Sequence, residues 1–251
     1  MGDNVECSVS AKTRDVEPSA GPNMPAASRF GSWVRRYRRV FPFPLVLVML
    51  IGLRPKLFGN EFADAAITIL GIALCGLGQS LRLWAWGSNA AAGKRGLRDR
   101  GAYALMRHPL YSGNFLILAG LVVIYNNPVA YPLLLGTFAY VYNVITRPEE
   151  KYMIENFAAD YLGYRDQALP RFLPALGKLA TAFRTTFPFH WQFAWHKEYQ
   201  SCCAWWAGIA GLELYKDVLA HGWSPFSPGI LLWVAVMGFS AALVIGLGVR
   251  K

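Results

Sequence analysis

The chain has 251 residues, of which 54% are hydrophobic and only 16% are charged, against about 25% charged residues in an average soluble domain. This hydrophobicity excludes a chain that is disordered throughout, and four cysteines are too few for a disulfide scaffold. The net charge of +10 suits either nucleic acid or the anionic face of a membrane, so the positions of the charges must decide between these partners.

Residues 1–28 are polar and contain no apolar core after a basic start, so they predict a disordered cytoplasmic tail instead of a secretory signal peptide. Beyond the tail, apolar runs alternate with charged segments, and a transmembrane helix needs about 20 apolar residues. A turn at Asn126-Asn127-Pro128 divides the longest charge-free run into a helical hairpin. The sequence predicts about six transmembrane helices, at residues 40–53, 65–81, 110–125, 129–146, 199–212 and 228–249.

The basic residues support this topology. With six spans, 21 of the 25 Lys and Arg residues lie on the same side as both termini, and only Arg54 and Lys56 lie on the other. Such an imbalance is typical of cytoplasmic loops. We therefore expect an all-α, multi-pass integral membrane protein with both termini in the cytoplasm, located in a bacterial inner membrane. The same distribution explains the net charge with membrane lipids as partners and no nucleic acid.

The cysteines give little support to redox or metal chemistry. The sequence contains no Cys-x-x-Cys and no His/Cys cluster with zinc spacing, so we expect no metal. Cys75 falls inside a predicted span, where it suits packing as a small apolar residue. The adjacent pair Cys202-Cys203 keeps a thiol-redox membrane protein as one alternative function.

Polar exceptions to the apolar pattern gather on the cytoplasmic side, in residues 93–111, 147–150 and 157–174. In the first segment, Pro109 suits the first turn of a helix, because its missing N–H needs no partner there. His108 then lies near the N-cap, beside free amide donors that favour an anion. A membrane anchor at the interface is the simpler explanation for an isolated His.

The second segment places two carboxylates, Glu149 and Glu150, at an anionic membrane surface, where they require a cationic partner. A ligand, Arg147 or Arg107 would each supply one, and a solvated helix start is the simpler alternative. Because the two spans of the hairpin are antiparallel, their cytoplasmic ends lie together. We therefore expect His108 and Glu150 to form one polar site at the end of the bundle.

The order of these features is specific, although each feature alone is not. Between residues 71 and 174 the chain carries, in order, Tyr103-x-x-x-Arg107-His108-Pro109-x-Tyr111, the hairpin, Glu149-Glu150, Tyr161-x-x-Tyr164 and Arg171-Phe172-Leu173-Pro174. This part resembles the isoprenylcysteine carboxyl methyltransferase family, which is related to the membrane phospholipid amine methyltransferases. The resemblance implies a membrane-embedded methyltransferase that takes S-adenosylmethionine from the cytoplasm and a lipophilic substrate from the bilayer.

The resemblance also implies roles for individual residues. The cofactor pocket would be lined by Arg95, Gly96, Leu97, Arg98, Tyr103, His108, Pro109, Leu110, Tyr111, Glu149 and Glu150. Gly76 and Gly78 match a Gly-x-Gly that lines the cofactor in the phospholipid relatives, with close helix packing as the alternative. Gln79 and Arg82 follow one turn later and would face the same pocket. Catalytic roles fall to Glu150, His108 and Arg147, since the first two can accept a proton and Arg147 can orient a carboxylate.

Three parts of the chain are expected: the tail 1–28, a methyltransferase core 29–174, and an extension 175–251 with two further spans. In the core, residues 157–170 predict an amphipathic interfacial helix after the fourth span. In the extension, Glu213, Lys216 and Asp217 share one helix face and can pair. The acceptor stays open among a carboxylate, an amine and a thiol. A non-catalytic transport or assembly subunit that retains the fold is the second alternative.

Overall fold

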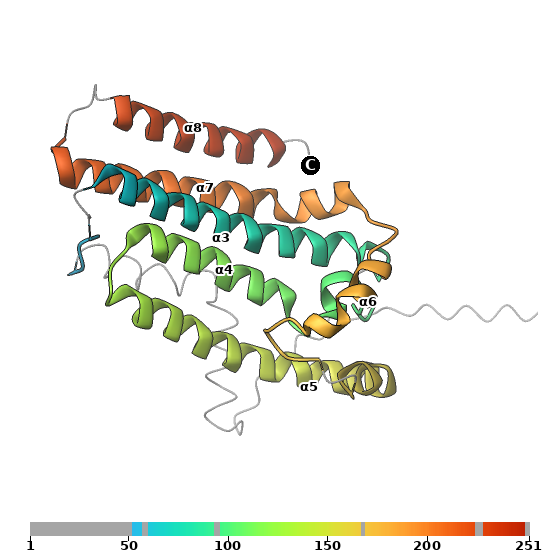
Figure 1. Ribbon diagram of the computed structural model, residues 1–251. Helices are drawn as coiled ribbons and strands as arrows, with labels where there is room; N and C mark the ends of the chain where they lie inside the picture. Colours follow the sequence, from blue (N-terminus) through green and yellow to red (C-terminus); the bar gives the residue numbers. More distant parts are fainter. Residues whose placement is uncertain (1–51, 57–59, 93–95, 167–168, 224–227, 249–251) are drawn as a thin grey trace, which may run out of the picture.

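The computed structural model describes residues 52–56, 60–92, 96–166, 169–223 and 228–248, and all regular structure among them is helical. The expected tail and almost all of the first span lie outside these residues. Five long helices lie side by side, and the short α6 (Leu179–Arg184) crosses one end of them (Figure 1). In their spatial order the long helices are α8 (Pro228–Gly248), α7 (Trp191–His221), α3 (Glu61–Gly87), α4 (Pro109–Tyr125) and α5 (Gly136–Asp166).

Helices α3 and α4 pack with their backbones in close approach. A Cβ added at Gly78 would lie 2.5 Å from the carbonyl oxygen of Gly113, and one added at Gly71 would lie 2.6 Å from that of Gly120. Only glycine allows such an approach, so Gly78 fits the packing alternative that its sequence context had left open. Nothing lies within 4 Å of a Cβ added at Gly76.

The turn between α4 and α5 forms as predicted. α4 has Pro109 in its first turn and is capped after Tyr125 by Asn126, whose φ of 51° is left-handed, a conformation that Asn tolerates. Asn127 then accepts hydrogen bonds from the N–H groups of Val129 and Ala130, at 2.9 and 3.2 Å. A π-helical turn, Tyr131–Leu135, leads from there into α5. The expected helical hairpin is therefore present.

One boundary differs from the prediction. We expected the fourth span to end near residue 146 and a separate interfacial helix to follow, ending at Pro170. Instead α5 continues through Pro148 to Asp166 as one helix. A proline inside a helix removes one hydrogen bond and bends the helix, but it does not have to end it. The last turns of α5 run in a different direction from the rest (Figure 1).

The described helices only partly match the expected spans. One helix, Phe62–Gly87, is long and apolar enough to cross a membrane, and only 22% of its apolar window is buried. Two shorter apolar helices, Pro109–Tyr125 and Pro228–Leu243, lie over the expected third and sixth spans. The expected fifth span is the middle of α7, which begins earlier, at Trp191, and carries Lys197 and Glu198.

Candidate functional site

The site begins where the segment before α4 meets the segment after α5. The backbone N–H groups of Arg107 and His108 donate to the carbonyls of Pro170 and Arg171, at 2.9 and 3.0 Å. These two hydrogen bonds hold the segments side by side, although the segments are about sixty residues apart in sequence. As a result, the side chains of Arg107, His108 and Arg171 all reach the same point on α5.

That point is the carboxylate of Glu150, whose side chain is 11% exposed. Arg107 lies 3.0 Å from it, His108 Nε2 lies 3.1 Å away, and Arg171 donates from two nitrogens at 2.8 and 3.1 Å. Burial alone would raise the pKa of Glu150, but the hydrogen bonds from His108 and Arg171 and the charges of both arginines lower it to about 2. The predicted proximity of His108 and Glu150 is confirmed, and Arg107 and Arg171 are the cations that pair with Glu150.

The neighbouring carboxylate, Glu149, has a different environment. It accepts a hydrogen bond of 2.7 Å from the hydroxyl of Tyr111, and this is its single hydrogen-bond partner within the described ranges. The Tyr111 ring lies 5.0 Å from the ring of Tyr142, measured between centroids. Glu149 is therefore a partly buried carboxylate beside aromatic rings, with a neutral donor and, among the described side chains, no cation in contact.

Tyr103 joins the loop before α4 to α5. Its carbonyl accepts a hydrogen bond of 2.7 Å from the hydroxyl of Tyr164. Burial raises the pKa of Tyr103, while the nearby charge and hydrogen bond of Arg98 act to lower it and Glu149 acts to raise it. The guanidinium of Arg98 itself lies over the ring of Trp86, 4.4 Å from its centroid. Tyr103 thus stands within the electrostatic reach of both a basic and an acidic side chain.

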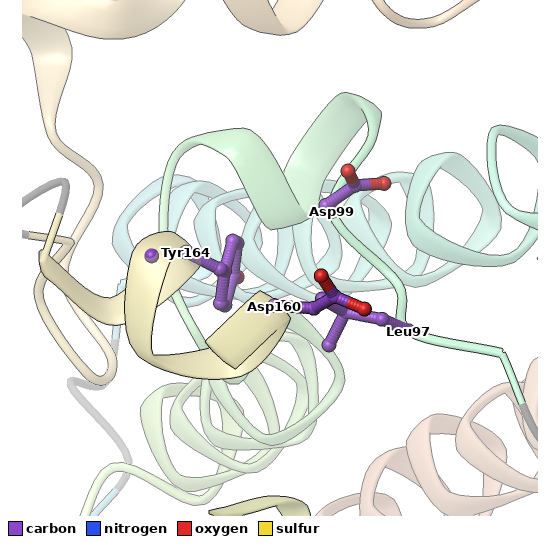
Figure 2. Close-up of a pocket in the computed structure, with 5 residues that line it drawn as sticks. Leu97, Asp99, Asp160 and Tyr164 are labelled. Carbon is purple, nitrogen blue, oxygen red and sulfur yellow. The ribbon is translucent and has the colours of Figure 1, made fainter. Parts of the chain in front are cut away.

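A hollow of about 530 Å³ opens on the outer side of this loop. Leu97 and Asp99 from the loop face Asp160 and Tyr164 from the end of α5 across it, as Figure 2 shows. Leu97 also packs against the buried cluster that contains Tyr164. Because the Tyr164 hydroxyl is bonded to Tyr103, the polar groups that remain toward the hollow are the two exposed aspartates.

Two comparisons with known proteins bear on this arrangement. Residues 66–160 match the family model described as phospholipid methyltransferase. The protein-S-isoprenylcysteine O-methyltransferase of Saccharomyces cerevisiae is 28% identical over 122 residues, which cover 45% of this chain and 51% of the yeast protein. The resemblance to these methyltransferases is confirmed. The chain spans about half the length of the curated relative that it matches, and no solved structure matches it.

The residues matched to the methyltransferase family model cover α4 and most of α3 and α5, and leave out α6, α7 and α8. The matched part therefore contains the Glu149 and Glu150 carboxylates. The helices α6, α7 and α8 lie beyond the residues that match this model.

Other residues implied by the methyltransferase resemblance are more scattered. Arg95 lies outside the described residues, and Gly96 is exposed beside it. Pro109 is fully buried in the first turn of α4, with Leu110 half-buried after it. Arg147 is exposed on α5 and does not contact the carboxylates, although it was expected to orient the substrate. Its assigned role stays a prediction.

The sequence analysis assigned no role to Arg171. The one feature that could have indicated a role is that Arg171 is the single charged residue in the motif Arg171-Phe172-Leu173-Pro174. Its guanidinium holds Glu150 and also donates to the side chain of Asn143 at 3.1 Å. Sequence reasoning also missed Glu198, a buried acid on α7 that binds Gln79 and Arg82. Those two residues were expected to face the cofactor pocket.

The alternatives for redox and metal chemistry gain no support. Cys75, Cys202 and Cys203 are free cysteines. Adjacent residues on a helix point in different directions, so a bond between Cys202 and Cys203 would require α7 to unwind. Across the part of the chain that is described, no group of three His, Cys, Asp or Glu side chains is placed to hold a metal ion.

Proposed function

We propose that the protein is a membrane methyltransferase that transfers a methyl group from S-adenosylmethionine to a lipophilic acceptor. The observation that carries this proposal is the contrast between two adjacent carboxylates. Glu150 is held by two arginines, whereas the Tyr111 hydroxyl is the one hydrogen-bond partner of Glu149 in the part of the chain that the structure describes. A site of this kind suits a small cationic ligand, and the relationship to membrane methyltransferases supplies the class of that ligand.

The residues present fit the charges of S-adenosylmethionine. Glu149 can accept the ammonium group, since its remaining lone pairs have no donor among the described side chains. Tyr111 and Tyr142 offer ring faces to the sulfonium. Arg107 can donate to the carboxylate of S-adenosylmethionine, because its Nε is buried and lacks a hydrogen-bond partner within the described residues.

This assignment gives Glu149 and Glu150 different roles, whereas the sequence alone did not distinguish which of them contacts the cofactor. Glu150 has a pKa of about 2, so it is a weak proton acceptor at neutral pH. The side chain of His108 offers the other possible proton acceptor. Its Nε2–H donates to Glu150, which leaves Nδ1 as the nitrogen that can take a proton, with the carboxylate fixing the ring.

When bound, S-adenosylmethionine supplies an electrophilic methyl group, whose bond to sulfur breaks as the acceptor's lone pair forms a new bond to carbon. An amine or thiol acceptor also releases a proton, which His108 can receive at Nδ1. A carboxylate acceptor needs no base, and Arg147 would orient it. Because the transfer is an in-line displacement, the main task of these side chains is to hold the two reactants in position.

The proposed setting is a multi-pass membrane protein with this site at the cytoplasmic face. The apolar residues that α3 and α8 expose support it: Ile69, Leu77, Leu232 and Phe239 are each more than half exposed. Apolar side chains of this size suit contact with lipid. The charged ends of α4 and α5 then lie at the headgroups, beside the path of a lipophilic acceptor.

The test is calorimetric binding of S-adenosylmethionine to the detergent-purified protein and to two variants, Glu149→Gln and Glu155→Gln. Losing an ionic hydrogen bond to the ammonium costs about 1.5–3 kcal/mol, so Glu149→Gln should weaken binding on the order of tenfold to a hundredfold. Glu155 is an exposed carboxylate on the same helix, and its variant should bind like the wild type. A radiolabelled methyl group is then traced into lipid, protein and volatile fractions.

If a folded wild-type protein does not bind S-adenosylmethionine, the proposed function is wrong, and the non-catalytic alternative replaces it. If binding occurs but Glu149→Gln leaves it unchanged, the enzyme class survives and the assignment of Glu149 does not.

A further inference from the structure

Glu198 lies on α7, outside the part of the chain that matches the methyltransferase family, and is only 1% exposed. Both of its carboxylate oxygens are engaged by α3. Arg82 donates from Nε at 2.7 Å and from a terminal nitrogen at 2.9 Å, Gln79 donates at 3.1 Å, and the indole of Trp86 donates at 2.8 Å. A buried charge with four donors in this geometry is fully compensated.

Arg82 carries this network toward the proposed site. One edge of its guanidinium is held by Glu198, and its other terminal nitrogen donates to the side chain of Asn114. Asn114 follows Tyr111 by three residues on α4, so the two side chains lie on the same face of that helix. Arg82 and Glu149 both act electrostatically on Tyr103, which places the guanidinium within range of the acidic side of the site.

Trp86 gives Glu198 a second route to the site. While its indole N–H binds Glu198, its ring carries the guanidinium of Arg98 at 4.4 Å. Arg98 belongs to the loop that the family resemblance assigns to the cofactor pocket. One carboxylate of α7 thus fixes two basic residues, Arg82 directly and Arg98 through Trp86.

We propose that Glu198 is a positioning residue of the cofactor pocket, which neutralises Arg82 and thereby lets the pocket accept a cationic cofactor. This inference rests on the proposed function, and it gives the extension a part in the site. It also makes a specific electrostatic claim. With Glu198 ionised, the Arg82–Glu198 pair contributes no net charge. Without the charge of Glu198, Arg82 is an uncompensated cation within electrostatic range of the part of the site that contains Glu149.

The two forms of the cofactor make this claim measurable. S-Adenosylmethionine carries one net positive charge, whereas the demethylated product, S-adenosylhomocysteine, lacks the sulfonium and is neutral overall. A change in the local charge therefore alters the affinity for the first and leaves the second nearly unaffected. For unit charges on the order of 10 Å apart in a protein, the effect on a binding constant is roughly tenfold.

The experiment measures the dissociation constants of both compounds by calorimetry for the wild type and for Glu198→Gln, Arg82→Gln and the double variant. Glu198→Gln should weaken S-adenosylmethionine roughly tenfold more than S-adenosylhomocysteine. Arg82→Gln leaves Glu198 as an uncompensated anion. The ratio of the dissociation constant of S-adenosylmethionine to that of S-adenosylhomocysteine should therefore fall below its wild-type value. The double variant, neutral at both positions, should return the ratio to that of the wild type.

Glu213→Gln is the matched control, because Glu213 also pairs within α7 but toward the other end of the bundle, with Lys216. It should leave the ratio unchanged. A mere loosening of the fold weakens both compounds equally, so equal losses in every variant would overturn the proposal. If Glu198→Gln does not fold, Arg82→Gln and the double variant still test the sign. A wild type that binds neither compound refutes the proposed function instead.

Discussion

Replacing Glu150 by Gln removes the carboxylate that Arg107, His108 and Arg171 share. The amide keeps one acceptor oxygen but no charge, so two partly buried guanidinium groups lose their counter-charge. We expect this variant to be less stable than the wild type at neutral pH. We also expect the difference between them to shrink in acid.

The magnitude follows from the pKa of Glu150, which is about 2 against the usual 4.5. One pKa unit corresponds to about 1.4 kcal/mol, so the ionised carboxylate adds about 3 kcal/mol to the free energy of unfolding. Because the folded-state pKa is the lower one, this contribution is present above about pH 4.5 and is lost as the pH falls toward 2. About 2 kcal/mol of it is already lost at pH 3.

Thermal unfolding of the detergent-solubilised protein at pH 7, 5 and 3 measures this. For a chain of this size, about 3 kcal/mol corresponds to a Tm lower by roughly 6–12 °C at pH 7. Glu155→Gln is the control, since Glu155 is 59% exposed and its pair with Lys151 spans 3.7 Å. The reasoning would be refuted if the wild type and Glu150→Gln had the same Tm at pH 7, or if their difference in Tm were as large at pH 3 as at pH 7.

Two further substitutions test the packing. Gly78→Ala should cost roughly 1–3 kcal/mol of unfolding free energy because its Cβ would meet Gly113, whereas Gly76→Ala, in open space, should gain up to about 1 kcal/mol; equal Tm values would contradict this. Lys216→Met should cost about 3 kcal/mol by leaving Glu213 buried without its cation, and adding Glu213→Leu should recover most of that loss in the same thermal assay.

The contact between His108 and Glu150 could be predicted because it depends on local signals. A charge-free run, a turn at its centre and a proline at the start of α4 are enough to place the start of α4 beside the part of α5 that carries Glu150. The pairing of Glu213 with Lys216 was predicted for the same reason, since residues three apart on a helix are neighbours. In both cases the spacing of residues along the chain is sufficient to predict the contact.

The continuity of α5 through Pro148 was missed because a proline is compatible with both a bend and an end. The network around Glu198 was missed for a different reason. Its partners lie on α3, more than a hundred residues earlier, and no periodicity in either helix indicates which acid meets which arginine. Tertiary packing decides such pairs, and a single sequence does not contain that information in readable form.

The two glycine contacts between α3 and α4 also decide which part of the bundle can move. Backbone touches backbone at both levels, Gly78 with Gly113 and Gly71 with Gly120, so neither helix can slide without a clash or separate without opening a void. The pair therefore behaves as one rigid body. α5 is joined to it by a turn before its first residue and by the bonds of Glu149 and Glu150 near its middle. An elongated acceptor that enters between α4 and α5 would thus have to strain the same bonds that shape the pocket.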